Sequence, residues 1–446
     1  MKEKVKDLTS GSPGKLILLL AVPLMLGNIF QQFYTMVDTM VVGQVVGVKA
    51  LAALGAVDWI VWMILGIASG MTQGFSILVS QYYGAQKWDG LKKAVARSYI
   101  LTAILSVTVL AVSQAGAAPL LRLLNTPSDI MGMALLYLRV ALCGVPCIAA
   151  YNCLASMLRA MGNSKSPLVA MIIAALINIF LDLLFVAGFG WGVGGAAAAT
   201  VIGQTFSAVY CYLVIKKISY LQVKKEDFQG EPGMDATLLK MGTPVSLQNI
   251  IIAIGGFALQ FAVNGYGSLV VAGFTATNKM YGILELAAIS YGYAITAYVG
   301  QNLGAGEIGR IKRGVKSGAV MAVATSLCMS VIMLIAGRFI LSLFISGEPE
   351  QAKIALDVAF GYLVVLSVCL WILYLLYVFR SAIQGLGNTL LPMLSGVAEL
   401  VVRVVVVFTL PLFMGKEGIY LAEIGAWLSA VLLLIPGYIW NIKKYK

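Results

Sequence analysis

The sequence predicts an all-α polytopic membrane protein with 12 transmembrane helices in two pseudo-symmetric six-helix bundles. Of its 446 residues, 60% are hydrophobic and only 11% are charged, whereas soluble domains carry about 25% charged residues. Apolar runs of about 20 residues recur along the chain, and each is long enough to cross a bilayer as a helix. They lack the alternating pattern of a transmembrane β-barrel.

Twelve apolar runs account for most of the chain. The expected spans are residues 16–43, 52–80, 95–118, 130–157, 167–188, 193–216, 241–265, 270–300, 316–337, 357–383, 390–413 and 418–440. The lysine-rich start leads into a long span without a small-residue cleavage site, so the first run reads as an anchor and not as a cleaved signal peptide.

The net charge of +12 is distributed as a topology signal and not as a nucleic-acid-binding surface. Most basic residues fall in alternate loops: Lys2, Lys4, Lys6, Lys15, Lys87, Lys92, Lys93, Arg97, Arg159, Lys165, Lys216, Lys217, Lys224, Lys225, Lys240, Arg310, Lys312, Arg313, Lys316, Arg380, Lys443, Lys444 and Lys446. The opposite loops hold Lys49, Arg122, Arg338, Lys353 and Lys416. The positive-inside rule then predicts a multi-pass protein with both termini in the cytoplasm.

The two halves of the chain resemble each other. "VPLMLGN" (22–28) matches "TPVSLQN" (243–249) at an offset of 221 residues. "SQYYGAQKWDGLKKAV" (80–95) matches "GQNLGAGEIGRIKRGV" (300–315) at 220, and "RAMGNSKSP" (159–167) matches "QGLGNTLLP" (384–392) at 225. We expect one bundle at 1–218, a cytoplasmic linker at 219–240 and a second bundle at 241–446. Such a parallel duplication is typical of secondary transporters, although a duplicated structural protein would show it too.

Several kinds of chemistry are excluded or disfavoured by composition. The chain has no histidine, so any proton carrier must be a carboxylate. The six cysteines fall in apolar spans and read as packing residues. "GWGVGG" (190–195) joins two spans and follows no strand, and no Walker motif is present, so we expect no cofactor and no ATPase subunit.

Four polar residues of the first half could meet at one depth. Asn178 and Asp182 share a helix face, Thr200 lies at about the depth of Asp182 on the next span, and Asp38 lies in the outer part of the first span. Their oxygens could bind Na⁺ or another hard cation, or the two carboxylates could share a proton. Buried acids that only support packing are the alternative, but intramembrane acids are functional by default.

The second half offers fewer candidates. Glu399 precedes Arg403 by four residues, which favours a neutralising intrahelical pair, whereas Glu285 could bind a cationic substrate or a proton. Asp58 and Glu423, near span ends, are expected to be solvated. Aromatic and methionine side chains could line an adaptable substrate cavity, although helix packing is an alternative for each: Phe33, Tyr34, Met157, Met161, Met280, Tyr281, Tyr291 and Tyr293.

The chain resembles the multidrug and toxic compound extrusion (MATE) family over nearly its full length. The resemblance rests on "PLMLGNIFQQFY", on an aspartate followed by "TMVVG", on "RAMGNSKSP", on N-x-x-x-D in the fifth span and on the duplication. It implies a bacterial inner-membrane antiporter that exports organic cations in exchange for Na⁺ or H⁺. It also implies a cation site in the first bundle at Asp38, Asn178, Asp182 and Thr200.

One departure from the family concerns the second half. Some relatives carry an acid in the seventh span and another in the tenth, but here the seventh has none and the tenth has only Asp357 at its outer edge. This leaves Glu285 as the best candidate for an acid with a coupling role in the second bundle.

The function expected from the sequence is secondary efflux of small lipophilic cations by alternating access, by a protein that acts as a monomer. One rival is a lipid-linked saccharide flippase, which would need several cavity cations where only Arg139, Lys279 and Arg403 are candidates. Another is an intramembrane aspartyl hydrolase that uses Asp38 and Asp182. A channel is the third.

Overall fold

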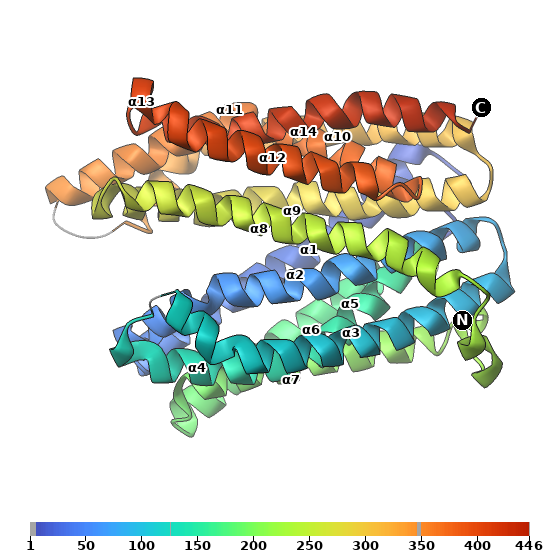
Figure 1. Ribbon diagram of the computed structural model, residues 1–446, viewed down its shortest axis with the longest axis horizontal. Coiled ribbons are helices and arrows are strands. Elements are labelled where there is room, and N and C mark those ends of the chain that lie inside the picture. Colours follow the sequence, from blue (N-terminus) through green and yellow to red (C-terminus); the bar gives the residue numbers. More distant parts are fainter. Residues whose placement is uncertain (1–5, 125, 346–348, 446) are drawn as a thin grey trace. The chain divides into compact units, whose positions relative to one another are not determined.

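The computed structural model describes residues 6–124, 126–345 and 349–445, with Val48 and Trp59 in their backbone only (Figure 1). Every regular element in these ranges is helical. Among the predicted basic residues, Lys2, Lys4 and Lys446 lie outside them. The predicted all-α class is therefore confirmed.

Among its described residues, the first half of the chain contains seven α-helices and one π-helix. They are α1 (Pro13–Val45), α2 (Val48–Gly84), α3 (Trp88–Leu123), α4 (Ser128–Cys143), α5 (Val145–Ala160), α6 (Lys165–Asp182), the π-helix η1 (Leu183–Gly188) and α7 (Gly192–Ile215). Two short 3₁₀ helices follow in the connection, η2 (Ser219–Leu221) and η3 (Lys225–Gln229).

The second half repeats this order without the break between α4 and α5. Its helices are α8 (Met234–Asn264), α9 (Ser268–Gly304), α10 (Ile308–Ser342), α11 (Pro349–Gly385), α12 (Leu390–Thr409), the short α13 (Pro411–Met414) and α14 (Glu417–Lys443).

The number of spans agrees with the sequence. In the described residues, 11 helices are long and apolar enough to cross a membrane, and the count reaches 12 when α4 and α5, bent by 43°, are taken as one span. Helices suit this role because their backbone groups are hydrogen-bonded within the segment.

The bend between α4 and α5 has a local cause. Pro146 lies in the first turn of α5, where it has no N–H to bond to the carbonyl one turn earlier. Gly144, at the break, leaves room for Val201 of α7: a methyl group built on Gly144 would lie 2.5 Å from Val201 Cγ2.

Contacts divide the chain into two compact units. The first comprises Met1–Ser10 and Val22–Ser246, and the second comprises Gly11–Ala21 and Leu247–Lys446. The start of α1 therefore belongs to the second unit and the start of α8 to the first. Pro23 and Pro244 lie inside these two helices, next to the points where membership changes.

The segment predicted as a linker, residues 219–240, is bound to charged residues of α3 in the first unit. Arg97 pairs with Asp235 and donates a hydrogen bond of 2.9 Å to the carbonyl of Phe228, and Lys93 lies 3.3 Å from Glu231. Trp88 and Tyr220 add an aromatic contact with ring centroids 5.1 Å apart. This connection is thus an ordered part of the unit.

Candidate functional site

Three helices of the first unit carry the four residues singled out above. Asp38 lies on α1, Asn178 and Asp182 on α6, and Thr200 on α7. Asp38, Asn178 and Asp182 are 5%, 1% and 0% exposed, and Thr200 is half-buried. The spacing of four residues on α6 directs Asn178 and Asp182 to the same face.

Polar contacts link these helices. Asn178 Nδ2 donates to Thr200 Oγ1 at 3.2 Å. Asp38 and Asp182 are close enough to interact electrostatically. Tyr34, one turn before Asp38, interacts with both carboxylates and accepts a hydrogen bond of 3.1 Å from Gln204 Nε2.

The two carboxylates form an incompletely satisfied site. Oδ1 of Asp38 is buried and accepts no hydrogen bond from any described residue. Two ionised carboxylates at close range repel each other, and burial adds a cost of several kcal/mol per charge. A proton shared by the pair, or a monovalent cation held by oxygens of Asp38, Asp182, Asn178 and Thr200, would relieve both penalties.

A change in helix type begins directly after Asp182. Residues 183–188 form one turn of π-helix, a feature often found at functional sites. Phe185 stacks on Trp191 with centroids 4.7 Å apart, and both pack on Gly195 of α7, where a methyl group would lie 3.0 Å from Trp191 Cβ. The wide turn and its aromatic support therefore fix the end of α6 that carries Asp182.

Sequence reasoning missed two members of this site. Gln204 is buried and lies one turn after Thr200 on α7, so the spacing rule that joined Asn178 to Asp182 would have found it. Tyr137 of α4 interacts electrostatically with Asp38 and Asp182. It sits in an apolar run, and no local signal distinguishes it.

Glu285 is the centre of a separate polar group in the second unit. It is half-buried on α9 and accepts a hydrogen bond of 2.8 Å from Tyr377 Oη of α11. Tyr281, one turn earlier on α9, stacks on Trp427 of α14 with ring centroids 5.8 Å apart. Among the described residues Glu285 forms no ion pair.

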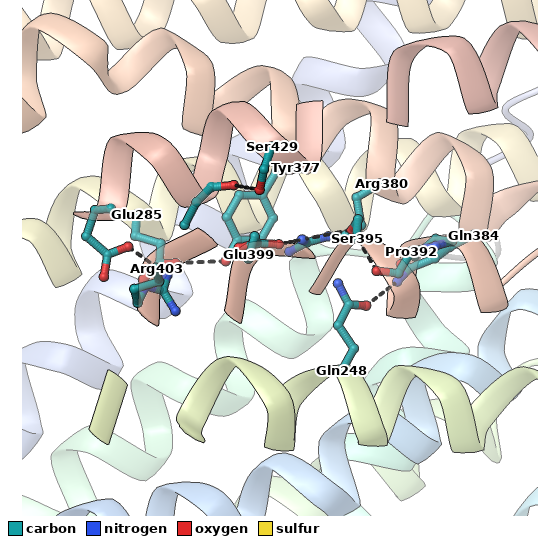
Figure 2. A network of polar contacts seen from close by, with 12 residues as sticks. Gln248, Glu285, Tyr377, Arg380, Gln384, Pro392, Ser395, Glu399, Arg403 and Ser429 are labelled. Atoms are coloured by element: carbon teal, nitrogen blue, oxygen red, sulfur yellow. Dashed lines mark hydrogen bonds and ion pairs between the residues drawn. The ribbon is translucent and has the colours of Figure 1, made fainter. Parts of the chain in front are cut away.

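The predicted pair between Glu399 and Arg403 is wrong. Glu399 pairs with Arg380 of α11, which also donates to Ser395 Oγ at 3.2 Å (Figure 2). Arg403 pairs with Glu423 of α14 at 2.8 Å. Neighbouring helices supply these partners, which a spacing rule for one helix does not see.

Two further assignments are corrected by the same contacts. Glu423, expected to be solvated, is 8% exposed and ion-paired. Arg380, grouped with the cytoplasmic basic residues, is buried in its pair with Glu399. Asp58 is exposed, as expected.

The remaining cavity candidates differ in exposure. Met157 and Met161 are fully buried in a hydrophobic cluster of the first unit. In the second unit, Met280 is buried and Tyr291 bonds to Thr325 at 2.9 Å. Phe33 is exposed and Tyr293 is half-buried.

Comparison with known proteins identifies the family. The MatE family model matches residues 23–184 and 244–409, once in each half. The chain is 31% identical over 360 residues to the probable multidrug resistance protein YpnP of Bacillus subtilis (strain 168), covering 80% of this chain and 79% of that protein. It is 29% identical to the probable multidrug resistance protein YoeA of the same strain, covering 96% and 94%.

The fold has solved counterparts. A structure described as the outward-facing conformation of a multidrug resistance MATE family transporter of the MOP superfamily superimposes with a TM-score of 0.92. The alignment covers 100% of this chain and 99% of the other at 24% identity. With family models matched in both halves and a relative above 30% identity, the chain belongs to the MatE family of membrane transporters.

Proposed function

We propose that this transporter exports organic cations in exchange for H⁺ or Na⁺, and that Asp38 and Asp182 take up the coupling ion. The observation that carries the proposal is the buried carboxylate pair with an acceptor oxygen on Asp38 that no described residue satisfies. Asn178 and Thr200, already hydrogen-bonded to each other, would complete an oxygen-rich site.

Coupling would follow from alternating access. An ion that binds one conformation more tightly than the other shifts the equilibrium between them by that difference in affinity. Pro23 lies inside α1 and lacks the N–H that a regular helix needs, so the segment that carries Asp38 can bend there. Ion binding to Asp38 would favour release of the exported cation.

Glu285 is the proposed contact for the positive charge of the exported molecule. It accepts a hydrogen bond from Tyr377 and forms no ion pair with any described residue, so its charge is available to a ligand. Tyr281 offers a ring face for a flat cation, with Met280 and Tyr291 on the same helix. YpnP and YoeA are named as probable multidrug resistance proteins, which supports several different drug molecules as substrates.

The rival functions are less well supported. A lipid-linked saccharide flippase needs several free cavity cations for a pyrophosphate, but Arg403, one of the three candidates, is ion-paired with Glu423. Membership in a transporter family removes the hydrolase. A channel would pass its substrate without exchange. We further propose location in a bacterial inner membrane with cytoplasmic termini, from the distribution of basic residues, and a monomer as the functional form.

The test is export of ethidium by the purified protein in proteoliposomes, driven in turn by a proton gradient and by a sodium gradient. Asp38→Asn and Asp182→Asn should each lower ion-driven export at least about 10-fold, since a neutral amide removes the charge that attracts the ion. Asp357→Asn is the matched control, because Asp357 is exposed and pairs with Arg338. Wild-type export by both site variants would refute the proposal.

A further inference from the structure

The two halves can be aligned residue by residue through their contacts. In the first unit, a methyl group on Gly27 of α1 would lie 4.0 Å from Met171 Cγ of α6. The repeat offsets of 221 and 225 convert this pair into Gln248 of α8 and Gly396 of α12, and a methyl group on Gly396 would lie 3.3 Å from Gln248 Cγ. Equivalent positions are thus in contact in both units. The glycine lies on α1 in the first unit and on α12 in the second.

The next pair of aligned positions lies two helical turns further along all four helices. There the first unit has Tyr34 and Asn178, and the second has Gly255 and Arg403. The sizes are again exchanged: a methyl group on Gly255 would lie 2.3 Å from Arg403 Nη1, so the guanidinium occupies the space that a side chain on α8 would take.

The same position joins the following helix in both units. Asn178 donates to Thr200 of α7 at 3.2 Å, and Arg403 donates to Glu423 of α14 at 2.8 Å. Arg403 is therefore the counterpart of Asn178, and a guanidinium stands where the first unit has a neutral amide.

One turn further, the second unit lacks the first unit's carboxylates. The counterparts of Asp38 and Asp182 are Leu259 and Val407, and both are buried. Among the described residues, the first unit thus has two carboxylates and no ion-paired cation at this level. The second unit has aliphatic side chains there, and one turn earlier it has Arg403, paired with Glu423.

We propose that Arg403 is a tethered cation: the second unit carries as part of its chain the positive charge that the first unit takes up from solution. Exchange of the coupling ion is then confined to the first unit, and Glu285 is left to the exported molecule because Arg403 and Arg380 neutralise Glu423 and Glu399. This inference rests on the ion-binding role proposed for Asp38 and Asp182.

Chemical rescue tests the tethered cation. Arg403→Ala should leave a space lined by Gly255 and Glu423 that accepts free guanidinium. The melting temperature of the full-length variant in detergent should fall by several degrees, and millimolar guanidinium chloride should restore at least half of that loss. Sodium chloride at equal concentration should not. Adding Glu423→Gln should abolish the rescue, and Arg338→Ala, which removes an exposed arginine, should show none.

A second set of variants keeps the test decisive if Arg403→Ala fails to fold. Gly255→Ala should lower the melting temperature when Arg403 is present and have less than half that effect beside Arg403→Lys, whose shorter head group lacks the Nη1 atom. Equal effects in both backgrounds, or equal responses of wild type and Arg403→Ala to guanidinium, would overturn the inference.

Ion flux separates the inference from the function on which it rests. The double variant Asp38→Asn/Asp182→Asn should lose nearly all substrate-coupled ion movement in proteoliposomes. Residual flux near half of wild type would place a second exchanging ion elsewhere and contradict the tethered cation. Undiminished flux would contradict the proposed role of Asp38 and Asp182, while leaving the rescue by guanidinium as an independent result.

Discussion

The intramembrane carboxylates described here have three kinds of interaction partner. Glu399 and Glu423 each pair with a buried arginine, Glu285 accepts a hydrogen bond from Tyr377, and Asp38 interacts with Asp182. The ion pairs stabilise by cancelling charge, although their desolvation limits the net gain. The other two arrangements leave negative charge available, which is why we assign them to ligands.

Glu285→Gln separates these roles. The amide keeps the shape of the side chain and can still contact Tyr377, but it removes the charge, and charge-assisted hydrogen bonds are worth roughly 1.5–3 kcal/mol. We expect the apparent KM for a monovalent organic cation to rise about 10-fold or more, with substrate-independent ion binding unchanged. Transport kinetics in proteoliposomes measure the first and equilibrium ion binding the second.

Glu417→Gln is the control for this substitution, because Glu417 is exposed at the start of α14. An unchanged KM in Glu285→Gln, or an equal rise in Glu417→Gln, would remove Glu285 from the substrate site.

At the scale of single helices, the sequence predicts the membrane spans better than it predicts the packing between helices. Apolar length identifies every span because the bilayer imposes it, and the four residues of the first site follow from depth and helix periodicity. The partners of Arg403 and the π-turn after Asp182 do not, since both depend on side chains from helices distant in sequence. The bend at Gly144 is intermediate: Pro146 signals it, but Val201 is visible only in the fold.

The bend gives a stability prediction. Gly144→Ala places a methyl group against Val201 at 2.5 Å, and overpacking of this kind costs typically 1–3 kcal/mol. The melting temperature in detergent should fall, and Val201→Ala in the same protein should recover most of the loss. Gly132→Ala, also in α4, should be neutral or slightly stabilising, because nothing lies within 4 Å of that methyl group. Equal effects at both glycines would contradict this explanation.

At the scale of the whole molecule, the two halves share a repeated fold. They differ in the side chains that stand at equivalent positions. Three sequence blocks at nearly constant offsets predict the repeat, and the contacts Gly27–Met171 and Gln248–Gly396 confirm its register within each unit. The sequence offset of 225 aligns Arg403 with Asn178, but the comparison gains meaning only when both side chains are seen bonded to the following helix.

An even number of spans in each half predicts that both chain ends lie on the same side of the membrane, and the basic loops predict that this side is the cytoplasm. A reporter that fluoresces only when folded in the cytoplasm should be active when fused after Lys446 or inserted at Gly230 of the connection. Alkaline phosphatase, which needs the opposite compartment, should be active at Gly415, in the turn between α13 and α14. The physical reason is that loops rich in lysine and arginine are retained on the cytoplasmic side.

Two active reporters of the same kind at Gly230 and Gly415 would contradict the span count, and exchanged activities would contradict the orientation. Exchanged activities would also reverse the direction assigned to export, because the outer half of α1, where Asp38 lies, would then face the cytoplasm.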